Sequence, residues 1–220
     1  MIDGASTDNT LKVLQEFLDE KSVLISEPDQ GIYDALNKGL RLSNGEVIGL
    51  LHSDDVFADK WVLSDVAEAF ADPGVDAVYG DLAYVSRLDK ERVIRHWRAG
   101  EFSPNSLTSG WMPPHPALFL RRHVFERWGL YDSQFQISAD YDLILRYFSQ
   151  DGFRTVYIPR VLVKMSLGGE SNKSFSKILK KSFEDYKVLK KNKIGGVVTL
   201  ILKNLRKIQQ FSFSFSSSLK

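Results

Sequence analysis

The sequence contains no cysteine, which excludes disulfides, thiol catalysis and zinc–thiolate sites. It has no uninterrupted apolar run of the roughly 20 residues that a bilayer-spanning helix needs. It also has no internal repeat of about 20–50 residues, which argues against solenoid and propeller folds. The composition that is present, 43% hydrophobic and 26% charged over 220 residues, predicts a globular protein with one substantial core.

Charge is distributed unevenly along the chain, although the formal net charge is only +1. Residues 173–220 carry 12 Lys and Arg against 2 Asp and Glu, a net charge of +10, whereas residues 1–172 have a net charge of −9. Such a split often marks a segment with its own anionic partner. We therefore predict two regions, an acidic body over 1–172 and a basic C-terminal tail over 173–220.

The tail has apolar residues at helical spacing between its lysines, which predicts a basic amphipathic helix, and 194–205 predicts a second, more apolar segment. The two helices either pack on the body with a solvated lysine face or attach to an anionic membrane surface. We favour the membrane, because Phe211, Phe213 and Phe215 have nothing obvious to bury them. This interpretation predicts a cytoplasmic protein, peripheral at the inner face of the membrane, with no nucleic-acid partner.

In the body, predicted helices alternate with short apolar strands. The helical pattern covers 11–19, 32–43 and 61–71, and strands are predicted at 23–26, 46–51 and 75–79. This alternation predicts an α/β fold with a mixed, mostly parallel sheet flanked by helices. The run 46–51 reads as a central strand buried on both faces.

Two adjacent carboxylates, Asp54 and Asp55, follow the run 46–51. Ligands of open α/β sheets bind beyond the carboxyl ends of the strands, so these side chains are placed to hold one. Two neighbouring like charges are stabilised by a cation, and carboxylate oxygens suit Mg²⁺ or Mn²⁺. The alternative is a solvated turn whose Asp residues cap the next helix.

Several motifs occur in an order that resembles family 2 glycosyltransferases of the GT-A fold. They are DGASTDNT (3–10), DQGIYDALNKG (29–39), NGE (44–46) leading to SDD (53–55), YGD (79–81), GWMPPHP (110–116) and ADYDLILR (139–146). The resemblance covers roughly residues 1–172. It implies an inverting, metal-dependent transfer of a sugar from a UDP- or GDP-linked donor to a glycan or lipid-linked acceptor, in cell-surface polysaccharide synthesis. No Gln-x-x-Arg-Trp motif of the processive synthases is present, so addition of a single sugar is expected.

The resemblance also implies a role for individual residues. Asp55 matches the position that ligates Mg²⁺ or Mn²⁺, Asp54 the neighbour of the donor's ribose or sugar, and Asp140 the general base. The roles it implies for the remaining candidates are nucleotide binding by Asp3 and Asp29, and a place in the acceptor or sugar pocket for Trp111, His115 and Asp81.

Each of these residues also has a simpler structural explanation. Asp140 suits the N-cap of its helix, and Asp81 suits a turn. His115 suits a bond to a backbone carbonyl, and Trp111 suits the core. Only the joint occurrence of the motifs raises Asp55 and Asp140 above these alternatives.

Two departures from the family pattern carry expectations of their own. The family normally has a strand, a turn and a helix before the Asp3 region, so we expect a sheet that lacks one central strand and has unpaired edges. Gly4 stands where many relatives carry a second Asp that contacts the base. Two other functions are therefore kept open: a catalytically inactive remnant that only binds a partner or membrane, and another Mg²⁺-dependent nucleotidyl or phosphoryl enzyme.

Overall fold

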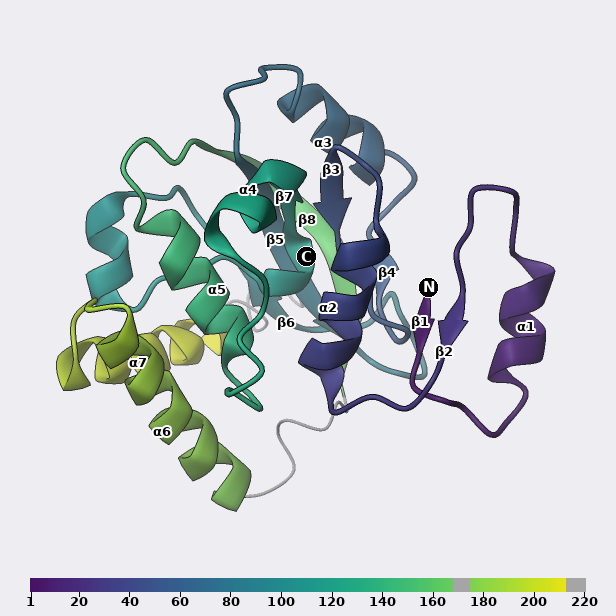
Figure 1. Ribbon diagram of the computed structural model, residues 1–220. Helices are drawn as coiled ribbons and strands as arrows, with labels where there is room; N and C mark the ends of the chain where they lie inside the picture. Colours follow the sequence, from purple (N-terminus) through teal and green to yellow (C-terminus); the bar gives the residue numbers. More distant parts are fainter. Residues whose placement is uncertain (168–174, 213–220) are drawn as a thin grey trace, which may run out of the picture.

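The computed structural model describes residues 1–167 and 175–212 (Figure 1). The helices are α1 (Thr10–Glu16), α2 (Ile32–Leu42), α3 (Val62–Ala69), α4 (Arg122–Trp128), α5 (Ala139–Phe148), α6 (Phe175–Lys191) and α7 (Val197–Ser212), with short 3-10 helices η1 (Pro104–Ser109) and η2 (His115–Ala117). The strands are β1 (Ile2–Asp3), β2 (Ile25–Ser26), β3 (Val47–Gly49), β4 (Val56–Phe57), β5 (Ala77–Val85), β6 (Val93–Trp97), β7 (Leu118–Arg121) and β8 (Thr155–Ser166).

The main sheet of the described chain has the strand order β3–β7–β5–β8–β4, and β6 also pairs with β5. The predicted mixed α/β sheet flanked by helices is therefore confirmed. The strand directions correct one detail, because β5 runs parallel to β8 but antiparallel to β6 and β7, and the outer strands β3 and β4 also pair antiparallel. Apolar runs reveal that a strand is buried but not which strand becomes its neighbour, so they do not determine direction.

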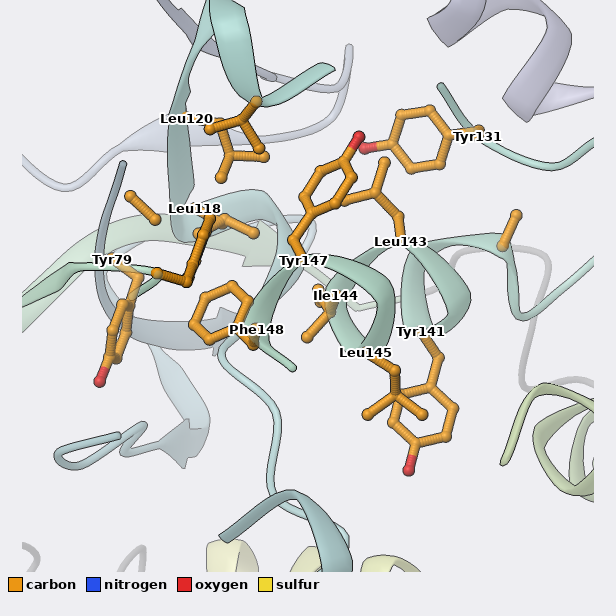
Figure 2. Packing of buried hydrophobic residues seen from close by; sticks show 14 of the residues in the cluster. Tyr79, Leu118, Leu120, Tyr131, Tyr141, Leu143, Ile144, Leu145, Tyr147 and Phe148 are labelled. Atoms are coloured by element: carbon orange, nitrogen blue, oxygen red, sulfur yellow. The ribbon is translucent and has the colours of Figure 1, made fainter. Parts of the chain in front are cut away.

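Side chains alternate between the two faces of the central strands. Ala77 and Tyr79 of β5 face one hydrophobic cluster, and Val78 and Leu82 face the other. The first cluster is filled largely by α5, whose Leu143, Ile144, Leu145, Tyr147 and Phe148 are buried, as Figure 2 shows. The second is covered by α3. The sheet is thus the middle layer of three, with α5 fixed rigidly against it.

β3 differs from the predicted central strand. It has only three residues, and one edge pairs with β7 while no described strand pairs with the other. Ile48 is buried but Gly49 is exposed, because the chain leaves the sheet there and residues 50–55 line a cavity instead. β1 and β2 form a separate parallel pair, which projects from the body together with α1 (Figure 1).

The basic tail folds back on the body. α6 lies against α5, and α7 lies against α6, β6 and η1 (Figure 1). Val188 and Leu189 of α6 belong to the hydrophobic cluster around α5. The predicted boundary at residue 172 and the aromatic residues Phe213 and Phe215 lie outside the described residues. Within the described residues, none of the helices combines the length and the apolarity that crossing a bilayer requires.

Candidate active site

A cavity of about 1720 Å³ opens between the loop after β3 and the helices on the same side of the sheet. Its walls come from α2, the loop 50–55, β6, the start of α5, and the tail helices α6 and α7. Segments from the whole length of the chain therefore meet at one place. Asp54, Asp55, Trp111, His115 and Asp140 all line this cavity.

The carboxylates of Asp54 and Asp55 differ in environment. Asp54 is exposed and lies 3.9 Å from the Arg87 guanidinium. Asp55 is only 6% exposed, and no described residue donates a hydrogen bond to its Oδ2. Burial raises the pKa of Asp55, because desolvation disfavours its charged form. The next element is the strand β4, so neither residue caps a helix.

A buried carboxylate oxygen without a partner is costly, and a divalent cation is one group that satisfies it. The described residues contain no cluster of three His, Cys, Asp or Glu side chains that would hold a metal by themselves. Mg²⁺ and Mn²⁺, however, are commonly held by one or two carboxylates together with substrate phosphates and water. Asp54 and Asp55 fit that kind of site.

Asp140 is the second residue of α5, and its side chain is partly buried. The Tyr33 hydroxyl donates to Asp140 Oδ1 at 3.3 Å and to the Ile137 carbonyl at 2.7 Å, and the Tyr141 N–H donates to Oδ1 at 2.8 Å. Ser138 occupies the N-cap position, so Asp140 is not the cap. Both hydrogen bonds go to Oδ1, and no described residue donates to Oδ2, which leaves that oxygen available to a ligand.

His115 and Trp111 form part of the cavity wall, but each also has a fixed partner. His115 Nε2 lies 2.7 Å from the Tyr131 hydroxyl, not against a backbone carbonyl. Burial lowers the pKa of His115 to about 4, so its imidazole is neutral at pH 7. Trp111 is 5% exposed, and its Nε1 donates to the Ala99 carbonyl at 2.7 Å. Trp111 is therefore chiefly a core residue that reaches the cavity.

Comparison with known proteins places the chain in a family. The family model described as "Glycosyl transferase family 2" matches residues 1–128. The chain belongs to glycosyl transferase family 2. A PGL/p-HBAD biosynthesis glycosyltransferase of Mycobacterium bovis BCG is 33% identical over 177 residues, which cover 78% of this chain and 66% of that protein. Chondroitin synthase of Escherichia coli is 29% identical over 181 residues, 80% of this chain and 25% of that protein.

Solved structures agree on the fold. The mannosyltransferase PcManGT from Pyrobaculum calidifontis, in complex with GDP-Man and Mn²⁺, has a TM-score of 0.60 at 16% identity and covers 100% of this chain and 65% of that one. TarS 1–349 of S. aureus, in complex with UDP-GlcNAc, has the same TM-score and identity and covers 99% and 64%. The fold is therefore the GT-A fold of glycosyltransferases. The chain spans just under two thirds of the length of these relatives.

Three predicted site residues of this family 2 chain lie away from the cavity lining. Asp3 accepts hydrogen bonds from Ser6 and, at 2.6 Å, from the Ser26 hydroxyl, which lower its pKa. Asp29 is held by Lys38, with Nζ 2.7 Å from Oδ1. The Asp3 carboxylate thus joins β1 to β2, and the Asp29 carboxylate joins the loop after β2 to α2.

Asp81 is the third predicted site residue outside the cavity lining, and its position shows that the predicted strand end at residue 79 is wrong. β5 continues through Asp81, where its pairing with β8 shifts register. The carboxylate is buried, accepts from the Ala99 N–H at 2.9 Å and from the Tyr157 hydroxyl at 2.7 Å, and holds the segment after β6 to the sheet. The Gly80-Asp81 pair therefore forms a bulge inside a strand and not a turn at the ligand side.

The tail helices supply site residues that the motif analysis missed. Lys181 on α6, Lys203 and Lys207 on α7, and Arg95 on β6 all line the cavity. The excess of basic residues in 173–220 was the sequence signal for the three lysines. It did not decide between packing of the helices on the body and attachment to a membrane.

The same helices hold the start of α5. Glu184 Oε2 accepts from the Ile137 and Ser138 N–H groups at 2.8 and 3.1 Å, and the Ser138 hydroxyl donates to Asp185 Oδ1 at 2.8 Å. Lys203 Nζ lies 2.8 Å from Asp185 Oδ2. A chain of contacts thus runs from α7 through α6 to the two residues that precede Ala139 and Asp140.

Proposed function

We propose that this protein transfers a sugar from a nucleotide-sugar donor to a glycan or lipid-linked acceptor, with inversion and with a divalent metal. The observation that carries the proposal is that one cavity holds two carboxylates with an available oxygen. Asp55 Oδ2 is buried and receives no hydrogen bond from a described residue, and the described donors to Asp140 all bond its Oδ1. The family and the relatives named above support a hexosyl-type transferase in polysaccharide or glycolipid assembly. The solved neighbours hold GDP-Man or UDP-GlcNAc, which makes GDP- and UDP-linked sugars the donors to test.

Asp55, with Asp54 beside it, would hold Mg²⁺ or Mn²⁺ against the donor diphosphate. The bound metal would stabilise the negative charge that develops on the leaving diphosphate. Asp54, which is more exposed, would contact the donor's ribose or sugar. His115 and Trp111 would contribute to the wall of the sugar pocket, His115 as a neutral imidazole.

Asp140 would act as the general base. Its free oxygen takes the proton of the acceptor hydroxyl while the hydroxyl oxygen forms a bond to the donor's C1. The bond from C1 to the diphosphate oxygen breaks in the same step, and the nucleoside diphosphate leaves with the electron pair. A single displacement of this kind inverts the anomeric centre.

Calorimetric titration of UDP and GDP, with and without Mn²⁺, tests the donor site first. We expect Mn²⁺-dependent binding of one nucleotide, weakened by Asp55→Ala but not by Asp140→Asn. Asp140→Asn should lower transfer at least about a hundredfold, the usual scale for a general base. Asp55→Ala should also abolish transfer, because the metal would no longer be held against the donor diphosphate. Asp151→Asn, an exposed carboxylate outside the cavity lining, is the matched control.

Near-normal transfer by either variant would contradict its assigned role. Release of inorganic phosphate or pyrophosphate, with no nucleoside diphosphate, would identify a phosphoryl or nucleotidyl enzyme instead. Folded protein that binds neither nucleotide would favour the inactive, binding-only alternative.

We also propose that the tail helices hold the protein peripherally at the cytoplasmic face of the membrane. α7 supports this because its apolar side faces outward: Val198 and Ile201 are 70% and 52% exposed, whereas Thr199 and Lys203 are buried. Exposed apolar residues among lysines suit an anionic bilayer surface. We expect Val198→Asp to abolish sedimentation with anionic vesicles without lowering stability, and unchanged sedimentation would refute the proposal.

A further inference from the structure

Two carboxylates of the cavity come from a different part of the fold than a group of its basic side chains. Asp54 and Asp55 lie at the β3 end, whereas Arg95, Lys181, Lys203 and Lys207, here called the basic wall, line the end formed by β6, α6 and α7. Asp140 also lines this cavity, at the start of α5. Such a separation creates one end suited to a cation and another suited to an anion.

The carboxylates near the basic wall offset only part of its positive charge. Asp185 is the described carboxylate paired with Lys203, at 2.8 Å. Lys207 Nζ bonds the neutral amide oxygen of Asn204 at 3.2 Å, and neither Lys181 nor Lys207 forms an ion pair with a described carboxylate in the cavity. Burial and the neighbouring charges of Lys181 and Arg95 lower the pKa of Lys207. Like charges held together in a half-buried place are stabilised by a bound anion.

We propose that the basic wall binds a phosphate group carried by the acceptor. The assignment to the acceptor, and not to the donor, rests on the proposed function. A single displacement brings the hydroxyl in from the side opposite the leaving diphosphate. Asp140, the proposed base, stands at the start of α5. Asp185 of α6 binds Ser138 there and pairs with Lys203 of α7, so an anion bound at the basic wall lies on the base's side.

The cavity rim on α6 suits an acceptor with an apolar portion. Ile178 lines the cavity and is 52% exposed, and it precedes Lys181 by three residues, on the same side of the helix. A phosphate at the basic wall would place an attached lipid chain next to this residue. A soluble phosphorylated glycan presents the same phosphate without that chain, and the experiment separates the two sources.

Binding of inorganic phosphate, measured by calorimetry in EDTA without nucleotide, tests the site independently of any transfer activity. We expect Lys181→Gln and Lys207→Gln each to weaken binding about tenfold, the scale of one charged hydrogen bond. Lys187→Gln is the matched control, because Lys187 is an exposed lysine on the same helix outside the cavity lining. Lys181→Arg keeps the charge and should keep the binding.

Equal phosphate affinity in Lys181→Gln, Lys207→Gln and the control, all with native thermal unfolding, would overturn the inference. Displacement of phosphate by UDP or GDP with Mn²⁺ would overturn the assignment to the acceptor, whereas simultaneous binding supports it. Absence of nucleotide binding with phosphate binding intact would refute the proposed function alone.

Vesicles of phosphatidylcholine with phosphatidic acid, compared with phosphatidylcholine alone, identify the source of the phosphate. Loss of phosphatidic-acid-dependent sedimentation in the Lys181→Gln, Lys207→Gln double variant supports a lipid-linked phosphate. Sedimentation that is unchanged in that variant, with phosphate binding lost, supports a soluble phosphorylated acceptor.

Discussion

Lys203 and Asp185 are the most deeply buried ion pair of the described chain, with exposed fractions of 5% and 1% and a separation of 2.8 Å. Replacing Lys203 with Met keeps a side chain of similar length but removes the charge. Asp185 would then remain buried with the Ser138 hydroxyl as its described hydrogen-bond donor. The variant therefore tests whether the contacts from α7 to the start of α5 stabilise the fold.

The expected cost follows from breaking a buried pair, which typically destabilises a protein by about 3–5 kcal/mol. We expect the lower end, about 3 kcal/mol, because the charge of Lys181 also acts on Asp185 and offsets part of the loss. The net contribution of the pair to stability is smaller than the stability lost when one partner alone is removed. Burial lowers the pKa of Lys203 to about 8, so desolvating the ammonium group already opposes the attraction.

Urea unfolding at pH 7 measures this cost. Asp185→Asn in the Lys203→Met background removes the stranded charge, so the double variant should recover about 2 kcal/mol relative to Lys203→Met alone. Lys187→Met, on the exposed side of α6, should change stability by no more than about 0.5 kcal/mol. The single variant Asp185→Asn completes the comparison. The contacts from α7 to the start of α5 are not a stabilising unit if Lys203→Met lowers stability no more than Lys187→Met does. The same conclusion follows if the double variant loses as much stability as the sum of the losses in Lys203→Met and Asp185→Asn.

Two further predictions concern the residues beside the cavity. The pKa of His115 is about 4 in the folded protein, below the ordinary 6.5. The stability that depends on the neutral ring is therefore complete above pH 6.5 and is lost toward pH 4, by at most about 3 kcal/mol. Urea titrations at pH 7 and pH 4.5 should show that His115→Gln reduces this loss. Gly110 has φ +75° and an added Cβ would lie 2.6 Å from the Lys203 backbone, whereas Gly100, at φ +68°, has open space. Gly110→Ala should therefore cost at least about 2 kcal/mol more than Gly100→Ala in thermal unfolding, and equal losses would show that η1 does not press on α7.

The sequence predicted the elements whose pattern is local and long. Helical spacing located α2, found at Ile32–Leu42 against a predicted 32–43, and α3, found at Val62–Ala69 against a predicted 61–71. The motif order placed Asp55 and Asp140 in one cavity, although 85 positions separate them in the chain. That pairing depends on tertiary structure, so only the resemblance to a family supplied it.

Hydrogen-bond partners could not be predicted in the same way. A carboxylate after an apolar run looks alike in the sequence whether it lines a cavity, as Asp55 does, or accepts from a backbone N–H, as Asp81 does. Gly80 suggested a strand end because glycine is a common turn residue. In the structure it is needed for close approach, because a Cβ there would lie 2.5 Å from Leu162 of the neighbouring strand.

α7 shows most clearly why the tail was hard to interpret. Hydrophobic periodicity assumes that a helix turns its apolar side toward the protein. On α7 the fully buried positions are Thr199 and Lys203, four residues apart. Leu200 packs partly buried against the core, whereas Val198, Ile201 and Leu205 are exposed. Thr199 and Lys203 face the protein because Lys203 pairs with Asp185 and the Thr199 hydroxyl donates to the Thr108 carbonyl at 2.7 Å. One helix can therefore shape the proposed anion site with its polar side and leave an apolar side for a membrane, so the two interpretations of the basic tail are compatible.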